Sequence, residues 1–474
     1  MAISAADRLA KRRLSIAGAS GIAVELINKL APFLIYHLAE QRLGVEKFGQ
    51  SMVGVSLIEM LLPFVVFGYA HHGTVQVAQV EKHVQGRERV VSDLLMLRFL
   101  HLMVVFAVGG IIWTFNFPYA HVMPLLAALS FVLVSGAYEL VWFEVATQRV
   151  VHLNVMIMSS RFSSLLLVYL FVQSPADYIW FAVLSLFSVF MVNTLAFLDV
   201  TRRISLCKPS WTRMRQHFQQ SRQYALLMIL LIIMERLDIL IAEQLYGSAG
   251  AGLFVGPARI GHSLIQVASA LTTAFFAEMI ILQHQEKLQQ HLELALWMMV
   301  AFWSPIVVGS LFVGDELLVF VFSENYRSMG PILSWVILGG AASAINASLG
   351  MQVLIVLGRI RFWLRALLVG VLVCGGLGWW LGNLYGLLGL AQAIVLTKLG
   401  LLATVAGYVR YTCVVFAIRP LIFAAVPALM MGVALAMLPQ LGLWSTIFTG
   451  AFIYFGSGAI LFRQRMTSFL RLLK

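Results

Sequence analysis

Residues 177–199 read DYIWFAVLSLFSVFMVNTLAFLD, and Arg202 and Arg203 follow shortly after. The stretch between the two aspartates carries no charge. Its length is about the 20 residues that a helix needs to cross a hydrocarbon core of about 30 Å. Lipid cannot satisfy backbone N–H and C=O groups, so a segment within it must form its hydrogen bonds internally, as a helix does. These residues therefore predict a transmembrane helix.

The rest of the chain repeats this pattern. Of its 474 residues, 61% are hydrophobic and 11% are charged, and the mean hydropathy is +0.89. Soluble domains are roughly 45–50% apolar and 25% charged. The apolar runs are continuous and not alternating, which favours helices over a β-barrel. We therefore predict an all-α integral membrane protein with about 14 transmembrane helices. The expected spans are 14–38, 49–71, 92–114, 120–143, 151–172, 177–199, 223–245, 252–277, 292–313, 330–357, 364–381, 387–409, 417–438 and 441–462.

Lysine and arginine are distributed unequally over the predicted loops. With the N-terminus inside, the inner segments hold 24 of the 33 basic residues, and the outer loops hold only Arg42, Lys47 and Arg327. The positive-inside rule then places both termini in the cytoplasm. The first span follows the basic stretch MAISAADRLAKRRLSIAG (1–18) and is long enough to be a retained helix and not a cleaved signal peptide. The net charge of +12 thus reflects membrane topology, and we expect no nucleic-acid partner.

An internal repeat predicts two lobes. The segments AEQRLGVEKFG (39–49) and AEQLYGSAGAG (242–252) align without gaps at an offset of 203 residues, with five identities. Each lies in the outer turn after the first span of its half, in the same orientation. Two six-helix lobes related by an axis along the membrane normal are therefore expected. The predicted divisions are an N-lobe at 1–200, a basic cytoplasmic linker at 201–222, a C-lobe at 223–410, and two extra helices with a cytoplasmic tail at 411–474.

Catalytic motifs are absent from the sequence. There is no HExxH, GxSxG, Walker A or GxGxxG pattern, so no catalytic residue, metal site or cofactor is expected. Cys207, Cys374 and Cys413 show no CxxC spacing and fit no disulfide or zinc pattern. The sequence thus favours a transporter over an enzyme.

Charged residues inside the predicted spans are the candidate functional groups. Such charges cost several kcal/mol near the bilayer centre unless they are paired or hydrated, so they usually face a cavity or the interior of a bundle. The cations predict a cavity that binds an anionic group, and the acids predict ion coupling. The expected substrate-binding residues are Lys29, Arg161, Arg236, Arg259 and Lys398, and the expected ion-coupling residues are Glu25, Glu59, Glu235 and Asp238.

Helical spacing limits which of these charges meet. Glu25 and Lys29 are four residues apart and can form a local ion pair. Glu235 and Asp238 share a helix face, where two carboxylates raise each other's proton affinity. The alternative for every one of these residues is a buried ion pair that only fixes helix packing. Arg98 lies nearer a span end and is expected to extend toward the inner surface, where His71 and His72 are expected to be hydrated.

Three stretches resemble bacterial polysaccharide flippases of the Wzx type. LAEQRLGVEKFGQSMVGVSL (38–57) is similar to their R-x-L-G-x-x-x-F-G outer turn. YELVWFEVATQRVVHLNVMIMSSRFSSLLLVYLFV (138–172) is similar to their tryptophan-containing end of span four and start of span five. RLDILIAEQLYGSAGAGLFVGPARI (236–260) is similar to their span seven. The similarity covers most of the chain and preserves the span count. One departure is Glu144-Val145, where the family usually has Gln-Gly, which leaves the substrate subtype open.

The resemblance implies a fold and a function. The fold is that of the multidrug/oligosaccharidyl-lipid/polysaccharide exporters. The function is transfer of undecaprenyl-diphosphate-linked oligosaccharide from the cytoplasmic to the outer leaflet by alternating access, driven by an ion gradient. It further implies the bacterial inner membrane, a role in O-antigen, lipopolysaccharide or exopolysaccharide synthesis, and contact with a polysaccharide polymerase and chain-length machinery.

Three alternatives remain open at this point. A cation-coupled multidrug exporter of the same superfamily should have an acidic cavity, whereas here five basic residues stand against four acids. A membrane-embedded polysaccharide polymerase usually needs a long outer loop, whereas the longest one here is 314–329. A peptidoglycan-precursor flippase would share the fold and would be essential for growth.

Overall fold

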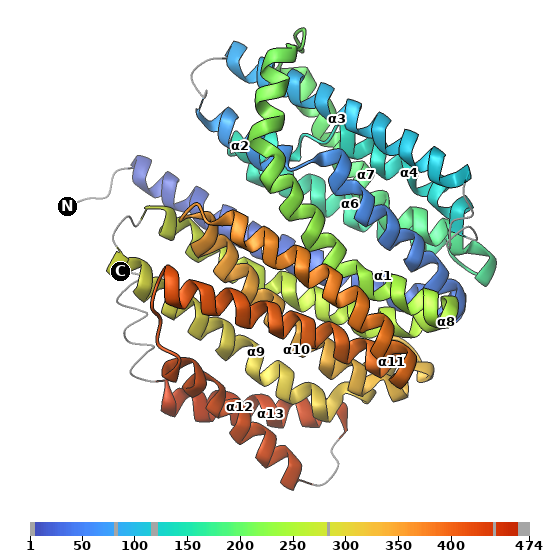
Figure 1. Cartoon of the computed structure of the whole chain (residues 1–474), viewed down its shortest axis with the longest axis vertical. Coiled ribbons are helices and arrows are strands. Elements are labelled where there is room, and N and C mark those ends of the chain that lie inside the picture. The colour runs from blue at the N-terminus through green and yellow to red at the C-terminus, as the bar shows by residue number, and fades with distance from the viewer. Residues whose placement is uncertain (1–4, 80–83, 115–121, 282–284, 439–441, 463–474) are drawn as a thin grey trace. The chain divides into compact units, whose positions relative to one another are not determined.

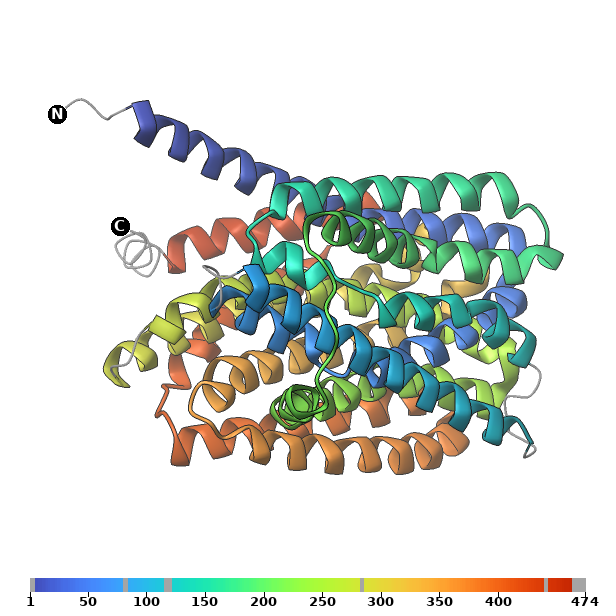
Figure 2. The ribbon, with the colours of Figure 1, turned by 90° about the horizontal axis from the view of Figure 1, so that it is seen from above.

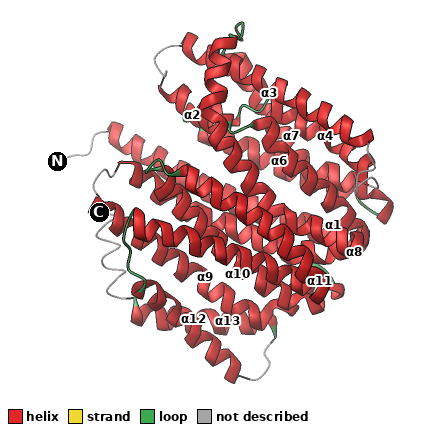
Figure 3. Cartoon of the chain, in the orientation of Figure 1, coloured by secondary structure: helices red, strands yellow, loops and turns green. Residues whose placement is uncertain are grey.

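The structure is a computed structural model that describes residues 5–79, 84–114, 122–281, 285–438 and 442–462. Side chains at 5–31, 84, 266–281, 285–288 and 352 are not described. Every regular element in the described ranges is helical (Figure 3). Ten of the helices found there are long and apolar enough to cross a membrane. The predicted all-α membrane class is therefore confirmed.

The chain divides into two compact units, residues 1–252 and 253–474. The lobe, linker and tail boundaries predicted from the internal repeat remain a prediction. Unit 1 contains α1 (Ala5–Val66), α2 (Tyr69–Gln79), α3 (Val84–Thr114), α4 (Met123–Ala137), α5 (Val141–Ala146), α6 (Val150–Phe171), η2 (Pro175–Asp177), α7 (Tyr178–Arg203) and the first part of α8 (Trp211–Ile281). Unit 2 contains the rest of α8, α9 (Gln285–Val321), η3 (Glu324–Met329), α10 (Gly330–Leu349), η4 (Gly350–Ile355), α11 (Ile360–Thr412), α12 (Arg419–Met437) and α13 (Leu443–Leu461).

Three long helices are bent at a glycine. Gly44 in α1, Gly247 in α8 and Gly386 in α11 have φ values of 72°, 68° and 70° with extended ψ. Only glycine adopts this backbone region without strain. Each bend lies where the sequence predicts a turn between two spans, and Figure 1 shows α1 reversing direction there. Dividing the long helices at these bends accounts for the 14 predicted spans.

The two repeated segments meet at their second shared glycine. A Cβ added to Gly49 would lie 2.0 Å from the backbone oxygen of Ser248, and one added to Gly252 would lie 2.1 Å from that of Val45. The offset of 203 residues that relates the segments also relates these two contacts. The five identical positions have the same burial in both copies: alanine and glutamate buried, glutamine and the first glycine exposed, the second glycine buried. Only glycine permits so close a backbone approach.

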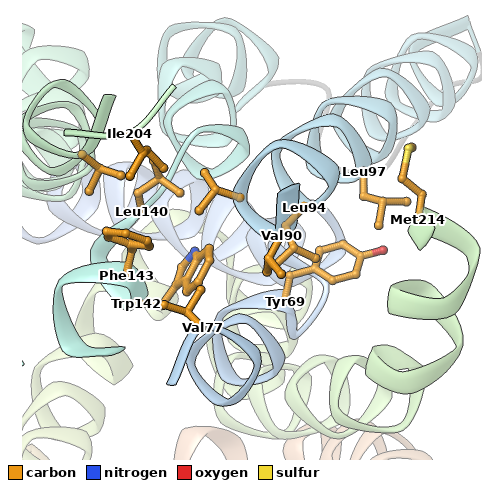
Figure 4. Close-up of a cluster of buried hydrophobic side chains, with 12 residues drawn as sticks. Tyr69, Val77, Val90, Leu94, Leu97, Leu140, Trp142, Phe143, Ile204 and Met214 are labelled. Carbon is orange, nitrogen blue, oxygen red and sulfur yellow. The ribbon is translucent and has the colours of Figure 1, made fainter. Parts of the chain in front are cut away.

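A hydrophobic cluster in unit 1 joins elements that are distant in sequence. It contains Tyr69 of α2, Leu94 of α3, Trp142 of α5 and Met214 of α8 (Figure 4). A Cβ on Gly73 would lie 2.6 Å from the Trp142 ring, so a glycine allows this tryptophan to pack against α2. The cluster holds the start of α8 against α3.

In unit 2, α10 packs between α9 and α11, and α12 and α13 pack against α9 and each other. Met431 and Tyr454 are buried in the α12–α13 contact. The Tyr454 hydroxyl donates to the backbone oxygen of Ala301 on α9 at 2.5 Å. The final two helices are therefore attached to unit 2 through α9.

Candidate functional site

Arg161 lies between α6 and α7, an antiparallel pair that Figure 2 shows joined by a short turn. Its side chain is half-buried, and Nη1 donates to the Ser188 hydroxyl at 2.9 Å. Ser188 is itself 1% exposed. One turn away, the Ser164 hydroxyl donates to the backbone oxygen of Leu184 at 2.5 Å. The arginine thus occupies a polar seam between two otherwise apolar helices.

Arg236 and Glu59 form one ion pair. The distance from Arg236 Nε on α8 to Glu59 Oε2 on α1 is 2.8 Å, and the two side chains are 9% and 25% exposed. From the sequence, Arg236 was expected to bind substrate and Glu59 to couple ion movement. The structure places them together, so each neutralises the other in this conformation.

The two other candidate acids of α8 differ in burial. Asp238 is 5% exposed, and its Oδ1 accepts the backbone N–H of Ile239 at 2.7 Å. Glu235, three residues earlier, is half-buried. A buried carboxylate in a membrane helix is a candidate for ion coupling because its charge is costly unless balanced.

The candidate residues of unit 2 are buried cations. Arg259 and His262 on α8 are 6% and 7% exposed, and Lys398 on α11 is 6% exposed. The aliphatic part of Lys398 packs on α10, where a Cβ on Gly339 would lie 3.4 Å from Lys398 Cδ. Within the described part of the chain, Lys398 forms no hydrogen bond or ion pair.

The last four helices of the chain contain no acid that could balance Lys398. Residues 325–474, which contain α10, α11, α12 and α13, include no aspartate or glutamate. Burial of an uncompensated ammonium is unfavourable, and an anion that enters the site offsets that cost. Lys398 is therefore the strongest candidate for an anion-binding group. The predicted pair Glu25 and Lys29 lies outside the described side chains.

Arg98 differs from the sequence expectation. It does not extend to the surface: its side chain is 0% exposed, and Nη1 lies 3.0 Å from Glu139 Oε2. Glu139 stands in the break between α4 and α5, which brings it to α3. His72 also differs, because it is buried and its Nε2 lies 2.8 Å from His217 Nδ1. Neither pairing has a local sequence signal, since the partners are distant in the chain.

Glu144 is the centre of an ion-pair cluster. It is 0% exposed and pairs with Arg203 and, at 3.8 Å, with Arg149. Asp199 Oδ2 lies 2.9 Å from Arg149 Nη1 and 2.6 Å from Arg203 Nη2. This is the position where the sequence departs from the Gln-Gly of the family it resembles. The departure replaces a neutral side chain with a carboxylate that joins α5 to α7.

Asp93 of α3 holds the start of α8. Its Oδ2 accepts Arg213 Nε at 2.6 Å, and its Oδ1 accepts the Ser210 backbone N–H at 2.8 Å. The hydrogen bond to Asp93 raises the pKa of the Arg213 guanidinium. Burial lowers the pKa of His217, 4.0 Å from the same carboxylate, and the Asp93 charge opposes this shift.

A cavity of about 680 Å³ with a mixed polar and apolar lining lies at the ends of α9, α10, α12 and α13, in the predicted outer part of unit 2. The Gly330 N–H donates to Asp315 Oδ1 at 2.8 Å, at the start of α10. Glu324 pairs with Arg327 at 2.8 Å on the exposed side. Asp315 thus stabilises the start of α10.

These features define an all-α membrane fold, with glycine bends between spans and buried charges in the helices. Among solved structures with this fold, the lipid II flippase MurJ in an inward closed conformation has a TM-score of 0.73 and 14% identity, covering 95% of this chain and 99% of that one. The eukaryotic MATE transporter AtDTX14 has a TM-score of 0.57 and 15% identity, covering 89% and 99%. An inward-facing multidrug resistance MATE family transporter of the MOP superfamily has a TM-score of 0.56 and 14% identity, covering 86% and 95%. No family model and no curated protein sequence matches the chain. At these identities the likeness shows the fold.

Proposed function

We propose that this protein is a flippase for undecaprenyl-diphosphate-linked oligosaccharide repeat units, acting in the bacterial inner membrane with both termini in the cytoplasm. The observation that carries the proposal is the buried Lys398, for which α10 to α13 supply no acid. The fold it shares with a lipid II flippase and the resemblance to Wzx-type sequences support the choice of a lipid-linked substrate.

The chemistry of the substrate fits a cationic site. A diphosphate and its sugars cannot cross about 30 Å of hydrocarbon without replacement of their hydration. Lysine and arginine provide that replacement, and arginine contacts phosphate oxygens in pairs. We assign this role to Lys398, Arg161, Arg236 and Arg259, together with Lys29. The lipid tail remains in the bilayer.

The Arg236–Glu59 pair suggests how an ion is coupled to substrate binding. Paired, Arg236 is neutralised and has little affinity for phosphate. When Glu59 binds a proton or another cation, Arg236 becomes available to the diphosphate. Asp238, Glu235 and Glu25 are the further acids that we assign to ion coupling, and the lobes then alternate access to the two leaflets. Released repeat units would pass to a polysaccharide polymerase and chain-length machinery.

The test is the sidedness of the lipid-linked oligosaccharide in a deletion strain of the native host. Spheroplasts are probed with a membrane-impermeant glycosidase after complementation with wild type, Lys398→Gln or Arg365→Gln. Arg365 is exposed on the same helix, so it is a matched control for loss of one charge. We expect wild type and Arg365→Gln to expose the oligosaccharide, and Lys398→Gln to leave it protected at equal protein level.

A second candidate is a cation-coupled multidrug exporter, favoured by the buried carboxylate of Asp238 and by the fold shared with MATE transporters. If the oligosaccharide is already exposed without this protein, the flippase proposal fails. A drug-susceptibility panel of the same strains then tests the exporter.

A further inference from the structure

The first three turns of α8 have one fixed face. Residues 211–222 read WTRMRQHFQQSR, and Met214, His217 and Ser221 are buried at spacings of three and four residues. At 100° per residue these positions share one side of the helix. The segment is therefore a packed surface helix, although its sequence reads as a basic loop.

Several contacts fix the rotation of this helix about its axis. Met214 lies in the hydrophobic cluster with Leu97 of α3 (Figure 4). Arg213 pairs with Asp93, and His217 contacts His72. The chain leading into the helix is also held, because the Cys207 N–H donates to the Ser92 hydroxyl at 2.9 Å. The other faces of the helix thus point in defined directions.

An adjacent strip carries alternating aromatic and basic side chains. It consists of Trp211, Arg215, Phe218 and Arg222, which fall within an arc of about 60° on an ideal helix. We call this the arginine–aromatic strip. Trp211 is 72% exposed, Phe218 is 38% exposed and partly stacked on Phe67, and both arginines are exposed. Within the described residues, neither arginine forms an ion pair or a side-chain hydrogen bond.

We propose that the arginine–aromatic strip binds anionic phospholipid headgroups of the leaflet at which α8 enters the membrane. The helix continues without a break from this strip into the span predicted at 223–245, so the strip lies at headgroup depth. Guanidinium groups contact lipid phosphates, and tryptophan favours the interface between headgroups and hydrocarbon. Exposed Arg202 and Lys208 in the preceding segment add to the positive field.

This continuity favours lipid over a soluble acidic partner. Binding of a cytoplasmic protein or nucleic acid does not require exposed aromatic rings that alternate with arginines directly before a membrane span. Attachment here would hold the segment between α7 and α8 at the membrane surface. The inference does not depend on what the protein transports.

The experiment uses the full chain in nanodiscs of phosphatidylcholine with about one-fifth phosphatidylglycerol. A photoreactive phosphatidylglycerol is crosslinked, and labelling is mapped to peptides containing 211–222, with photoreactive phosphatidylcholine for comparison. The test variant is Arg215→Gln/Arg222→Gln. The matched control is Arg359→Gln/Arg361→Gln, which removes two exposed arginines from another predicted inner loop. Arg215→Lys/Arg222→Lys keeps the charge.

We expect labelling by phosphatidylglycerol to fall about fivefold for each arginine removed from the strip. The lysine variant and the control variant should retain labelling by phosphatidylglycerol. The unfolding temperature should be unchanged in all variants. Equal labelling by both lipids in wild type would overturn the proposal. So would undiminished labelling in the glutamine variant, loss in the lysine variant, or an equal loss in the control.

Discussion

The two units treat buried charge differently. In unit 1, buried arginines have carboxylate partners: Arg98 lies against Glu139, and Arg236 lies against Glu59. In unit 2, Lys398 is just as buried, yet no acid occurs anywhere in residues 325–474. A pair such as Arg98–Glu139 stabilises the fold, whereas a buried charge that its own helices leave unbalanced is suited to a ligand. Four predictions test this difference, in order of decreasing effect.

The largest effect is expected at Arg98. Arg98→Met leaves the carboxylate of Glu139, which is 13% exposed, without its cation. This loss should lower the free energy of unfolding by about 3 kcal/mol. Chemical unfolding of the purified protein in detergent measures the change. The double variant Arg98→Met/Glu139→Leu removes both charges and should recover most of the loss. A double variant no more stable than the single one would show that the pair does not act as a unit.

The Glu144 cluster should give a smaller loss. Glu144→Gln restores the residue of the resembled family and weakens the contact with Arg203, while Asp199 still balances the arginines. We expect a loss of about 1.5–3 kcal/mol, the usual size for a hydrogen bond to a charged group. Thermal unfolding in detergent provides the readout. If stability is unchanged, the carboxylate at this position has a role other than joining α5 to α7.

Lys398 should behave in the opposite way. Lys398→Met removes a buried cation that has no ion-pair partner among the described residues. We therefore expect the free energy of unfolding to rise by about 1–2 kcal/mol, while the proposed export is lost. The same unfolding assay, paired with the spheroplast assay, measures both. Arg365→Met is the control, and it should change neither the free energy of unfolding nor the exposure of the oligosaccharide by much. A loss of stability at Lys398 comparable to that at Arg98 would remove the contrast between the units.

The smallest effect concerns pH. Burial lowers the pKa of His217, so the folded state holds this histidine neutral and the unfolded chain takes up its proton first. The contribution of His217 to the free energy of unfolding is therefore fully present above the pKa of about 6.5 that it has in the unfolded chain, and it declines as pH falls below that value. The slope for one group cannot exceed about 1.4 kcal/mol per pH unit. Unfolding temperatures between pH 5 and pH 8 measure it, and His217→Gln should flatten that part of the profile. Asp93, Arg213 and His72 face the same ring.

Local patterns in the sequence predicted the fold well. Apolar run length gave the spans and the all-α class, and the repeat placed turns at Gly44 and Gly247, where the helices bend. These features depend on composition and short spacing, which one sequence displays directly. The residues of the candidate site were chosen because an ionisable group inside an apolar run is rare, and their roles remain predictions.

Pairing between distant residues could not be predicted in the same way. The sequence contains Glu59 and Arg236 but does not specify that their helices adjoin. Arg98 was wrongly expected at the surface, because its depth was judged from its own span and the break that brings Glu139 to it lies elsewhere. His72 was expected to be hydrated for the same reason. Tertiary packing decides these cases.

The contact at Gly49 and Gly252 has a consequence for symmetry. Residue 49 touches residue 248, and residue 252 touches residue 45, so each copy of the repeated segment presents the same surface to the other. This is the arrangement of an isologous interface, as found across the twofold axis of a homodimer. One segment of 11 residues is thus complementary to itself. A half-length chain with a single copy of the segment would already contain both surfaces of this contact, because two such chains would present the same surface to each other.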